Sequence, residues 1–251
     1  MRILITNDDG INAEGLKVLE KIARKLSDDI WIIAPERNQS GAGHSLTLSD
    51  PIRARKIDEK KFAVTGTPTD CVVFACRHLM LGKNPDLVLS GINHGDNLAE
   101  NVTYSGTVAA AMEASLFSIP SIAMSLVIDN ESENHHWDVA EHYAPDIIKK
   151  IISCKIPENV FMNVNFPKLN IDEVLGAKIT RQGKHEISGD LIERKDPRNQ
   201  SYFWVGPLKT PQNVTPDTDL GAITDGYISI TPLRTDLTDM ATTIYLKEAF
   251  D

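Results

Sequence analysis

The first 35 residues constrain the fold most, because they contain a strand, a helix and a second strand in succession. Residues 2–6 form a short apolar run without alternation, which is typical of a strand buried on both faces. Residues 12–26 carry apolar side chains three or four positions apart, so they predict a helix with one buried face. A second apolar run follows at residues 30–34, and Pro35 ends it. Two parallel strands joined by a helix predict the α/β class, a mostly parallel sheet flanked by helices.

Strand-like and helical segments continue to alternate as far as residue 166. Further strands are predicted at residues 51–57, 61–65, 86–90, 121–126 and 160–166, the first two as a hairpin or a sheet edge. Further helices are predicted at residues 68–81, 105–116 and 137–154. Pro145 should kink or divide the last helix, because proline lacks a backbone donor. Residues 1–179 are therefore interpreted as a Rossmann-like catalytic core.

Residues 180–251 have a different composition and are predicted to form a protruding hairpin with a C-terminal oligomerisation segment that packs back on the core. Tyr202, Phe203 and Trp204 form the only aromatic triplet of the chain. An isolated hairpin cannot bury such side chains by itself, so we expect contact with another subunit. The conformation of residues 236–251 stays open, because Thr242–Tyr245 are β-branched or aromatic where a helix would be expected.

The formal net charge of -9 disfavours attraction to nucleic-acid polymers and to anionic membranes. A small anionic substrate would need local positive charge, which a metal cation or a helix N-terminus supplies. The N-terminus lacks a basic and apolar leader, and no segment approaches the ~20 apolar residues that span a bilayer. These features predict a cytoplasmic protein.

Polar residues follow three of the predicted strands. Asp8 and Asp9 follow the first strand, residues 38–44 follow the second, and Asn93 follows the strand at 86–90. Ligands in open parallel sheets bind beyond the carboxyl ends of the strands, where strand order reverses, so these loops should meet in one crevice. Two carboxylates, a hydroxyl and an amide are ligands that suit Mg²⁺ or Mn²⁺.

Each of these features also has a purely structural explanation. The Asp8–Asp9 pair alone is equally consistent with a turn or a helix N-cap. His44 fits a general acid, a phosphate contact or an ordinary loop residue. Residues 105–107 begin a helix whose free amides attract phosphate, although a hydroxyl cap is the commoner explanation. The glycines do not form the GxGxxG fingerprint, which disfavours a NAD-dependent dehydrogenase.

Seven ordered segments resemble one family, the SurE family of stationary-phase survival proteins. The segments are Thr-Asn-Asp-Asp-Gly at 6–10, Ala-Pro-Glu-Arg-Asn-Gln-Ser-Gly-Ala-Gly-His-Ser at 34–45, Thr-Gly-Thr-Pro-Thr-Asp-Cys-Val at 65–72, Ser-Gly-Ile-Asn-His-Gly at 90–95, Tyr-Ser-Gly-Thr-Val at 104–108, Thr-Arg-Gln-Gly at 180–183 and Asp-Gly-Tyr-Ile-Ser-Ile-Thr-Pro at 225–232. They span nearly the whole chain, so a chance resemblance is improbable.

The resemblance implies a nucleotidase that hydrolyses nucleoside 5′- and 3′-monophosphates, with some activity on polyphosphate. It also implies one divalent metal ion per subunit and a homodimer or homotetramer with an exchanged C-terminal segment. Its motifs assign the metal to Asp8, Asp9, Ser40 and Asn93. Candidate phosphate or substrate contacts in the same motifs are Asn7, Gly43, His44, Ser105, Gly106 and Thr107.

The mechanistic hypothesis is attack by a metal-activated water, with the helix that begins near Ser105 stabilising charge on the phosphoryl group and Asp9 as a candidate base. Direct attack by Asp8 is disfavoured, because the Asp-x-Asp spacing of haloacid-dehalogenase-type phosphatases is absent. A nucleotide-binding regulatory module without hydrolysis is the alternative function. Two carboxylates facing a phosphate disfavour it, because they would repel the ligand unless a cation lay between them.

Overall fold

The computed structural model describes residues 1–128, 135–185, 191–206 and 213–250. Its strands are β1 (Arg2–Thr6), β2 (Asp29–Pro35), β3 (Ala54–Asp58), β4 (Lys61–Val64), β5 (Leu87–His94), β6 (Ser121–Leu126), β7 (Val160–Phe166), β8 (Ala177–Ile179), β9 (Leu191–Lys195), β10 (Ser201–Val205) and β11 (Ile228–Arg234). Its helices are α1 (Glu14–Arg24), α2 (Pro68–Phe74), the π-helical turn η1 (Ala75–Leu79), α3 (Asn101–Tyr104), α4 (Gly106–Leu116), α5 (Trp137–Ser153), the 3₁₀ turn η2 (Ile171–Glu173), α6 (Asp219–Thr224) and α7 (Met240–Phe250).

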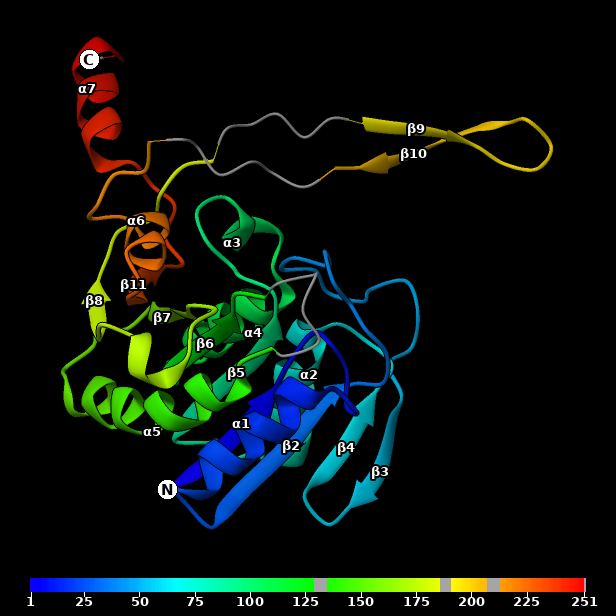
Figure 1. Cartoon of the computed structure of the whole chain (residues 1–251). Coiled ribbons are helices and arrows are strands. Elements are labelled where there is room, and N and C mark those ends of the chain that lie inside the picture. Colours follow the sequence, from blue (N-terminus) through cyan, green and yellow to red (C-terminus); the bar gives the residue numbers. More distant parts are fainter. Residues whose placement is uncertain (129–134, 186–190, 207–212, 251) are drawn as a thin grey trace.

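A nine-stranded sheet runs through the body in the order β3-β4-β2-β1-β5-β6-β7-β11-β8 (Figure 1). The neighbours from β4 to β7 are parallel, whereas β3 pairs antiparallel with β4 and β11 pairs antiparallel with β7. The predicted α/β class and the edge hairpin are therefore confirmed. Strand β1 lies between β2 and β5, so the strand order reverses at β1, and this is where the fold favours a ligand site.

Helices cover both faces of the sheet because successive residues of each buried strand point to opposite sides. Ile3 and Ile5 of β1 belong to the core beneath α1 and α5, whereas Leu4 belongs to the core beneath α2 and α4. Both cores consist mainly of buried aliphatic side chains, which explains the unbroken apolar runs in the sequence. This rigid sandwich fixes the positions at which the strands end.

Three elements differ from their predicted forms. Strand β5 continues to His94 instead of ending at residue 90, with an irregular register against β6 between Ser90 and Asn93. The predicted helix at 68–81 ends as a π-helical turn after Phe74. Pro145 does not divide α5, because the carbonyl of Glu141, four residues before it, accepts a hydrogen bond from Lys25 Nζ at 3.2 Å instead.

Two segments extend from the body. The hairpin of β9 and β10 projects far beyond the sheet, and α7 ends the described chain away from the core (Figure 1). The residues left open at 236–251 thus include a helix at 240–250, despite its β-branched residues. Strand β11, in contrast, returns to the main sheet between β7 and β8. The boundary at residues 179 and 180 between catalytic core and oligomerisation segment stays a prediction, and residues 186–190 and 207–212 lie outside the described ranges.

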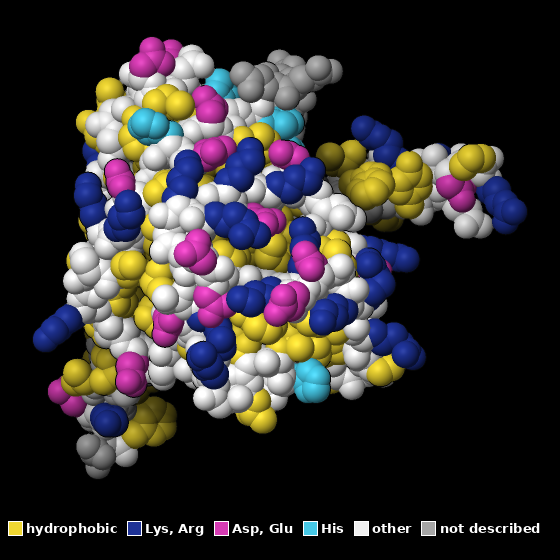
Figure 2. Space-filling view, turned by 90° about the horizontal axis from the view of Figure 1, so that it is seen from below, with side chains coloured by type: hydrophobic (Ala, Val, Ile, Leu, Met, Phe, Trp, Pro, Cys, Tyr) yellow, Lys and Arg dark blue, Asp and Glu magenta, His cyan; other side chains and the backbone are white. Residues whose placement is uncertain are grey.

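The face seen from below carries positive and negative side chains in alternation, without a continuous basic surface (Figure 2). Within the described ranges, none of the helices combines the length and the apolar character that a membrane span requires.

A candidate active site at the carboxyl edge of the sheet

The ends of β1 and β5 and the loop after β2 enclose a pocket of about 180 Å³ where the strand order reverses. The residues that line it are Asp8, Ser40, Gly41, Asn93, His94, Asp96, Asn97, Asn101, Tyr104 and Ser105. Three of the four predicted metal ligands, Asp8, Ser40 and Asn93, are therefore lining residues of one pocket. The fourth, Asp9, accepts a hydrogen bond at Oδ2 from the backbone N–H of the lining residue His94 at 3.0 Å.

Asp8 is the most deeply buried carboxylate of the pocket, with 4% of its surface exposed. Burial and, to a smaller extent, the neighbouring Asp9 raise the pKa of Asp8 to about 6, although hydrogen bonds from Thr107 oppose the shift. The Thr107 hydroxyl donates to Asp8 Oδ1. Helix α4 approaches Asp8 so closely that a Cβ at Gly106 would lie 2.9 Å from the Asp8 Cβ. Only glycine permits this approach.

Asp9 is half-buried and lies beside Asp8. Burial raises the pKa of Asp9 as well, and the hydrogen bond from the His94 N–H lowers it in part. Two adjacent carboxyl groups whose pKa values are both raised hold negative charge that the surrounding protein does not neutralise. Such a pair is stabilised by a cation.

The end of β5 positions the amide of Asn93. Gly91 has a φ of +134°, and a Cβ there would lie 2.2 Å from the Met124 carbonyl oxygen, so this bend requires glycine. Asn93 Nδ2 donates to the carbonyl of Gly95 at 2.9 Å. Because this bond holds the amide nitrogen of Asn93, its amide oxygen Oδ1 is the atom that remains to bind a ligand.

The loop after β2 is attached to the end of β1. The backbone N–H of Gln39 donates to the Asp8 carbonyl at 2.8 Å. The next N–H, that of Ser40, donates to Asn38 Oδ1 at 2.7 Å. These two bonds place Ser40 at the pocket although its side chain is exposed. A hydroxyl, an amide and two carboxylates thus come together from the ends of three neighbouring strands.

Three predicted phosphate contacts are not among the residues that line the pocket. Asn7 is fully buried beneath the loop, where its amide donates to the Gly10 carbonyl at 3.0 Å and accepts from the Gly10 N–H at 3.2 Å. Gly43 donates its N–H to the carbonyl of Tyr104 at 3.1 Å. His44 turns away toward α4, where its Nε2 lies 2.8 Å from Glu113 Oε2.

Of the three predicted phosphate contacts at the start of α4, one lines the pocket and two pack against Asp8. Ser105 lines the pocket and caps the helix, because its Oγ accepts from the Val108 N–H at 3.1 Å. Gly106 and Thr107 lie behind Asp8 instead. The first turn of this 11-residue helix therefore lies against Asp8, to which Thr107 donates both its hydroxyl and its backbone N–H.

The stretch from the last residue of β5 to α4 supplies further lining residues, namely His94, Asp96, Asn97, Asn101 and Tyr104. Both backbone polar groups of Asn97 form hydrogen bonds with side chains of β7. Its N–H donates to Asn165 Oδ1 at 2.8 Å, and its carbonyl accepts from Asn163 Nδ2 at 2.7 Å. The sequence signals for this stretch are its position after a buried strand and the motifs at 90–95 and 104–108, which contain His94 and Tyr104.

The donor set fits a hard divalent cation. None of the described residues that line the pocket is Lys or Arg, although Asp8 and Asp96 are both present. Across the described ranges there is also no group of three or more His, Cys, Asp or Glu side chains that would hold a metal. Carboxylate, hydroxyl and amide oxygens with water in the remaining positions are a coordination that Mg²⁺ accepts.

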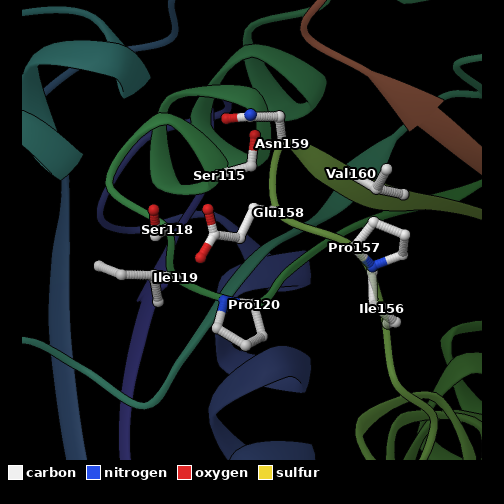
Figure 3. Close-up of a pocket in the computed structure, with 9 residues that line it drawn as sticks. All are labelled: Ser115, Ser118, Ile119, Pro120, Ile156, Pro157, Glu158, Asn159 and Val160. Atoms are coloured by element: carbon white, nitrogen blue, oxygen red, sulfur yellow. The ribbon is translucent and has the colours of Figure 1, made fainter.

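A second pocket lies at the opposite edge of the sheet. It has a volume of about 70 Å³ and is lined by residues around the starts of β6 and β7 (Figure 3). Glu158 is its one carboxylate, and Ile119, Pro120, Ile156 and Pro157 form much of its wall. This pocket is too small for a nucleotide and lies at the amino ends of parallel strands, where ligands do not normally bind.

Comparison with known proteins shows the family to which the chain belongs. The model of the family described as "Survival protein SurE" matches residues 3–189. A "5'-nucleotidase SurE" of Brucella anthropi is 54% identical over 242 residues, which cover 95% of this chain and 93% of the relative. One of Parvibaculum lavamentivorans is 52% identical over 251 residues, covering 99% and 91%. The crystal structure of the SurE protein from Aquifex aeolicus superimposes with a TM-score of 0.86 at 40% identity and covers all of both chains. This chain belongs to the SurE family.

Proposed function

We propose that this protein is a metal-dependent nucleotidase that hydrolyses nucleoside 5′-monophosphates to nucleoside and phosphate. The observation that carries the proposal is the pair of adjacent aspartates with raised pKa values in a pocket whose described lining has no Lys or Arg. A phosphate ester cannot approach two carboxylates unless a cation lies between them. The relatives named 5'-nucleotidase SurE support the same reaction.

Asp8, Asp9, Ser40 and Asn93 would hold one Mg²⁺ or Mn²⁺ per subunit. When bound, such a cation supplies a Lewis acid for a phosphoryl oxygen and lowers the pKa of water. Thr107 holds Asp8 in one orientation through its hydroxyl, and the His94 N–H does the same for Asp9. Asp9 is the candidate general base, because it is half-buried and its pKa is raised.

The N-terminus of α4 is the candidate site for the phosphoryl group. Ser105 lines the pocket at the first turn, and the positive end of the helix dipole there would stabilise charge that develops on the phosphoryl oxygens. The pocket of about 180 Å³ accommodates a phosphoryl group without enclosing the sugar. We therefore include 3′-monophosphates and short polyphosphates among the proposed substrates.

We propose further that the hairpin of β9 and β10 contacts other copies of the chain in a homodimer or homotetramer. Tyr202, Phe203 and Trp204 are all exposed, although they follow one another in a strand. A two-stranded hairpin with apolar side chains on both faces requires a partner surface. Light scattering coupled to gel filtration tests this: Trp204→Ser with Phe203→Ser should shift the mass toward the monomer, and an unchanged mass would exclude the hairpin as the contact.

Phosphate release tests the enzymatic proposal. AMP and GMP should release phosphate with Mn²⁺ or Mg²⁺, and EDTA should abolish the release. Binding of the nucleotide without any release would instead favour the regulatory module. Solvent ¹⁸O should appear in phosphate after a single turnover; its appearance in Asp8 would refute direct attack by water.

A further inference from the structure

Three aromatic rings stand together at the rim of the aspartate pocket. His94 ends β5 and lines the pocket, while His135 and Trp137 lie at the start of α5. The rings of His94 and His135 are 4.7 Å apart between centroids at an interplanar angle of 89°, and their Nε2 atoms are 3.5 Å apart. The ring of Trp137 lies 6.2 Å from that of His94 and is tilted by only 36°. We call His94, His135 and Trp137 the ring cluster.

One side of the ring cluster is packed against the protein, and the other side is exposed. Trp137 packs on α1, where a Cβ at Gly15 would come within 3.1 Å of the indole. Trp137 and His135 are half-buried, whereas His94 is exposed. The backbone of His94 is held by its N–H bond to Asp9. The imidazole of His94 is therefore an exposed aromatic surface beside the two carboxylates.

The size of the pocket leaves part of a nucleotide outside it. Its volume of about 180 Å³ is below the ~300–1,000 Å³ of pockets that enclose drug-sized ligands. With the phosphoryl group at the aspartates, the base of a nucleoside monophosphate must lie at the rim. Of the described residues that line the pocket, His94 and Tyr104 carry aromatic rings, and only His94 is part of a ring cluster.

We propose that His94, supported by His135 and Trp137, is the surface on which the base of the substrate stacks. The inference rests on the proposed nucleotidase function and adds to it the part of the site that distinguishes nucleotides from other phosphate esters. Stacking on an aromatic ring tolerates every base, because every base has a π-face. The site should therefore prefer nucleoside monophosphates over sugar phosphates without selecting one base strongly.

The test compares two substrates in the full-length, metal-loaded protein: AMP and ribose 5-phosphate, which lacks the base. The ratio of their kcat/KM values should exceed one in the wild type. His94→Ala should lower this ratio at least about fivefold, through KM for AMP, since stacking of one base corresponds to a factor of roughly 5 to 150. His94→Phe should keep the ratio within about twofold, because it retains the ring and removes both nitrogens.

His78→Ala is the matched control. His78 also stacks on an aromatic ring, that of Phe74 at 5.3 Å, but lies in η1, away from the pocket. It should leave the ratio unchanged.

The outcomes separate the two proposals. If neither ester releases phosphate, the nucleotidase proposal fails. If the wild type hydrolyses both esters with equal kcat/KM, or if His94→Ala leaves the ratio unchanged, the stacking surface fails while the enzyme stands. A loss in His94→Phe as large as that in His94→Ala would overturn stacking in favour of an imidazole nitrogen.

Discussion

Two buried aspartates, Asp8 and Asp219, illustrate two different uses of a carboxylate. Asp219 has no exposed surface, and its oxygens accept from three backbone N–H groups: those of Gly183 and Leu220 at 2.8 Å and that of Ala99 at 2.9 Å. Asp8 is almost as deeply buried but lies beside a second carboxylate, and its pKa rises to about 6. The protein itself satisfies Asp219, whereas Asp8 requires a ligand.

The comparison separates a structural carboxylate from a functional one by its partners rather than by its burial. Asp219 joins the root of the β9–β10 hairpin to Ala99, in the segment that also lines the pocket. Gln182 Nε2 adds a bond to the Ala99 carbonyl at 2.9 Å. We expect substitutions at Asp219 to affect folding and substitutions at Asp8 to affect catalysis.

The largest effect is expected from Asp8→Asn. Turnover of AMP should fall by about 10³-fold or more, because the variant loses a charged metal ligand. The free energy of unfolding of the metal-free protein should stay the same or rise, since a buried, unneutralised charge is removed. Initial rates and urea unfolding measure both. An active variant would contradict the catalytic role of Asp8, whereas one that fails to fold would place Asp8 in the same class as Asp219.

Asp219→Ala should give the opposite result. Three buried N–H groups lose their acceptor, so the free energy of unfolding should fall by about 3–5 kcal/mol. Urea unfolding measures the loss. Asp217→Ala is the control, because Asp217 forms an exposed ion pair with Arg181 at 2.8 Å and should have little effect. A stable Asp219→Ala variant would contradict the structural role.

The metal-free protein should lose stability as pH rises from about 4 to 6. The pKa of Asp8 is about 6 in the folded protein against an ordinary value of 3.8, so the folded state binds more protons within this window. The full loss is about 3 kcal/mol and is complete above pH 6, since one pKa unit corresponds to about 1.4 kcal/mol. Urea unfolding in EDTA at several pH values measures it. Asp8→Asn should flatten this dependence; an identical slope in the variant would exclude Asp8 as its source.

Ser40→Ala should have the smallest effect. Ser40 offers a neutral oxygen from an exposed loop, and water replaces such a ligand readily. The Mn²⁺ concentration for half-maximal activity should rise about tenfold, the lower limit of the effect that changes around a metal site have on its affinity. A metal titration of the rate measures this. If Ser40→Ala lost as much activity as Asp8→Asn, the charge of Asp8 would not explain the difference expected between the two ligands.

The sequence predicted the sheet well because its central strands are continuous apolar runs. It also predicted that Asp8, Ser40 and Asn93 would share an edge, since each follows a strand next to the point where strand order reverses. The SurE resemblance then supplied the assignment of these residues as ligands. Periodicity together with strand order was therefore sufficient to locate the candidate site.

The remaining features depend on tertiary contacts that a pattern does not contain. Residues 160–166 alternate like a half-exposed strand, yet Asn163 and Asn165 are fully buried because they bond to the backbone of Asn97. Asn7 was predicted to contact phosphate, but its side chain instead forms hydrogen bonds within the turn at Gly10. The ring cluster joins residues 94 and 135–137, which no local pattern connects.

Anomalous diffraction from crystals soaked with Mn²⁺ tests the central claim most directly. We predict one strong peak per subunit, within bonding distance of oxygens from Asp8 and Asp9 and next to Ser40 and Asn93. The Asp8→Asn variant, soaked in the same way, should lose this peak. A wild-type crystal without a peak at the two aspartates, or with its peak at His94 and His135 instead, would contradict the account.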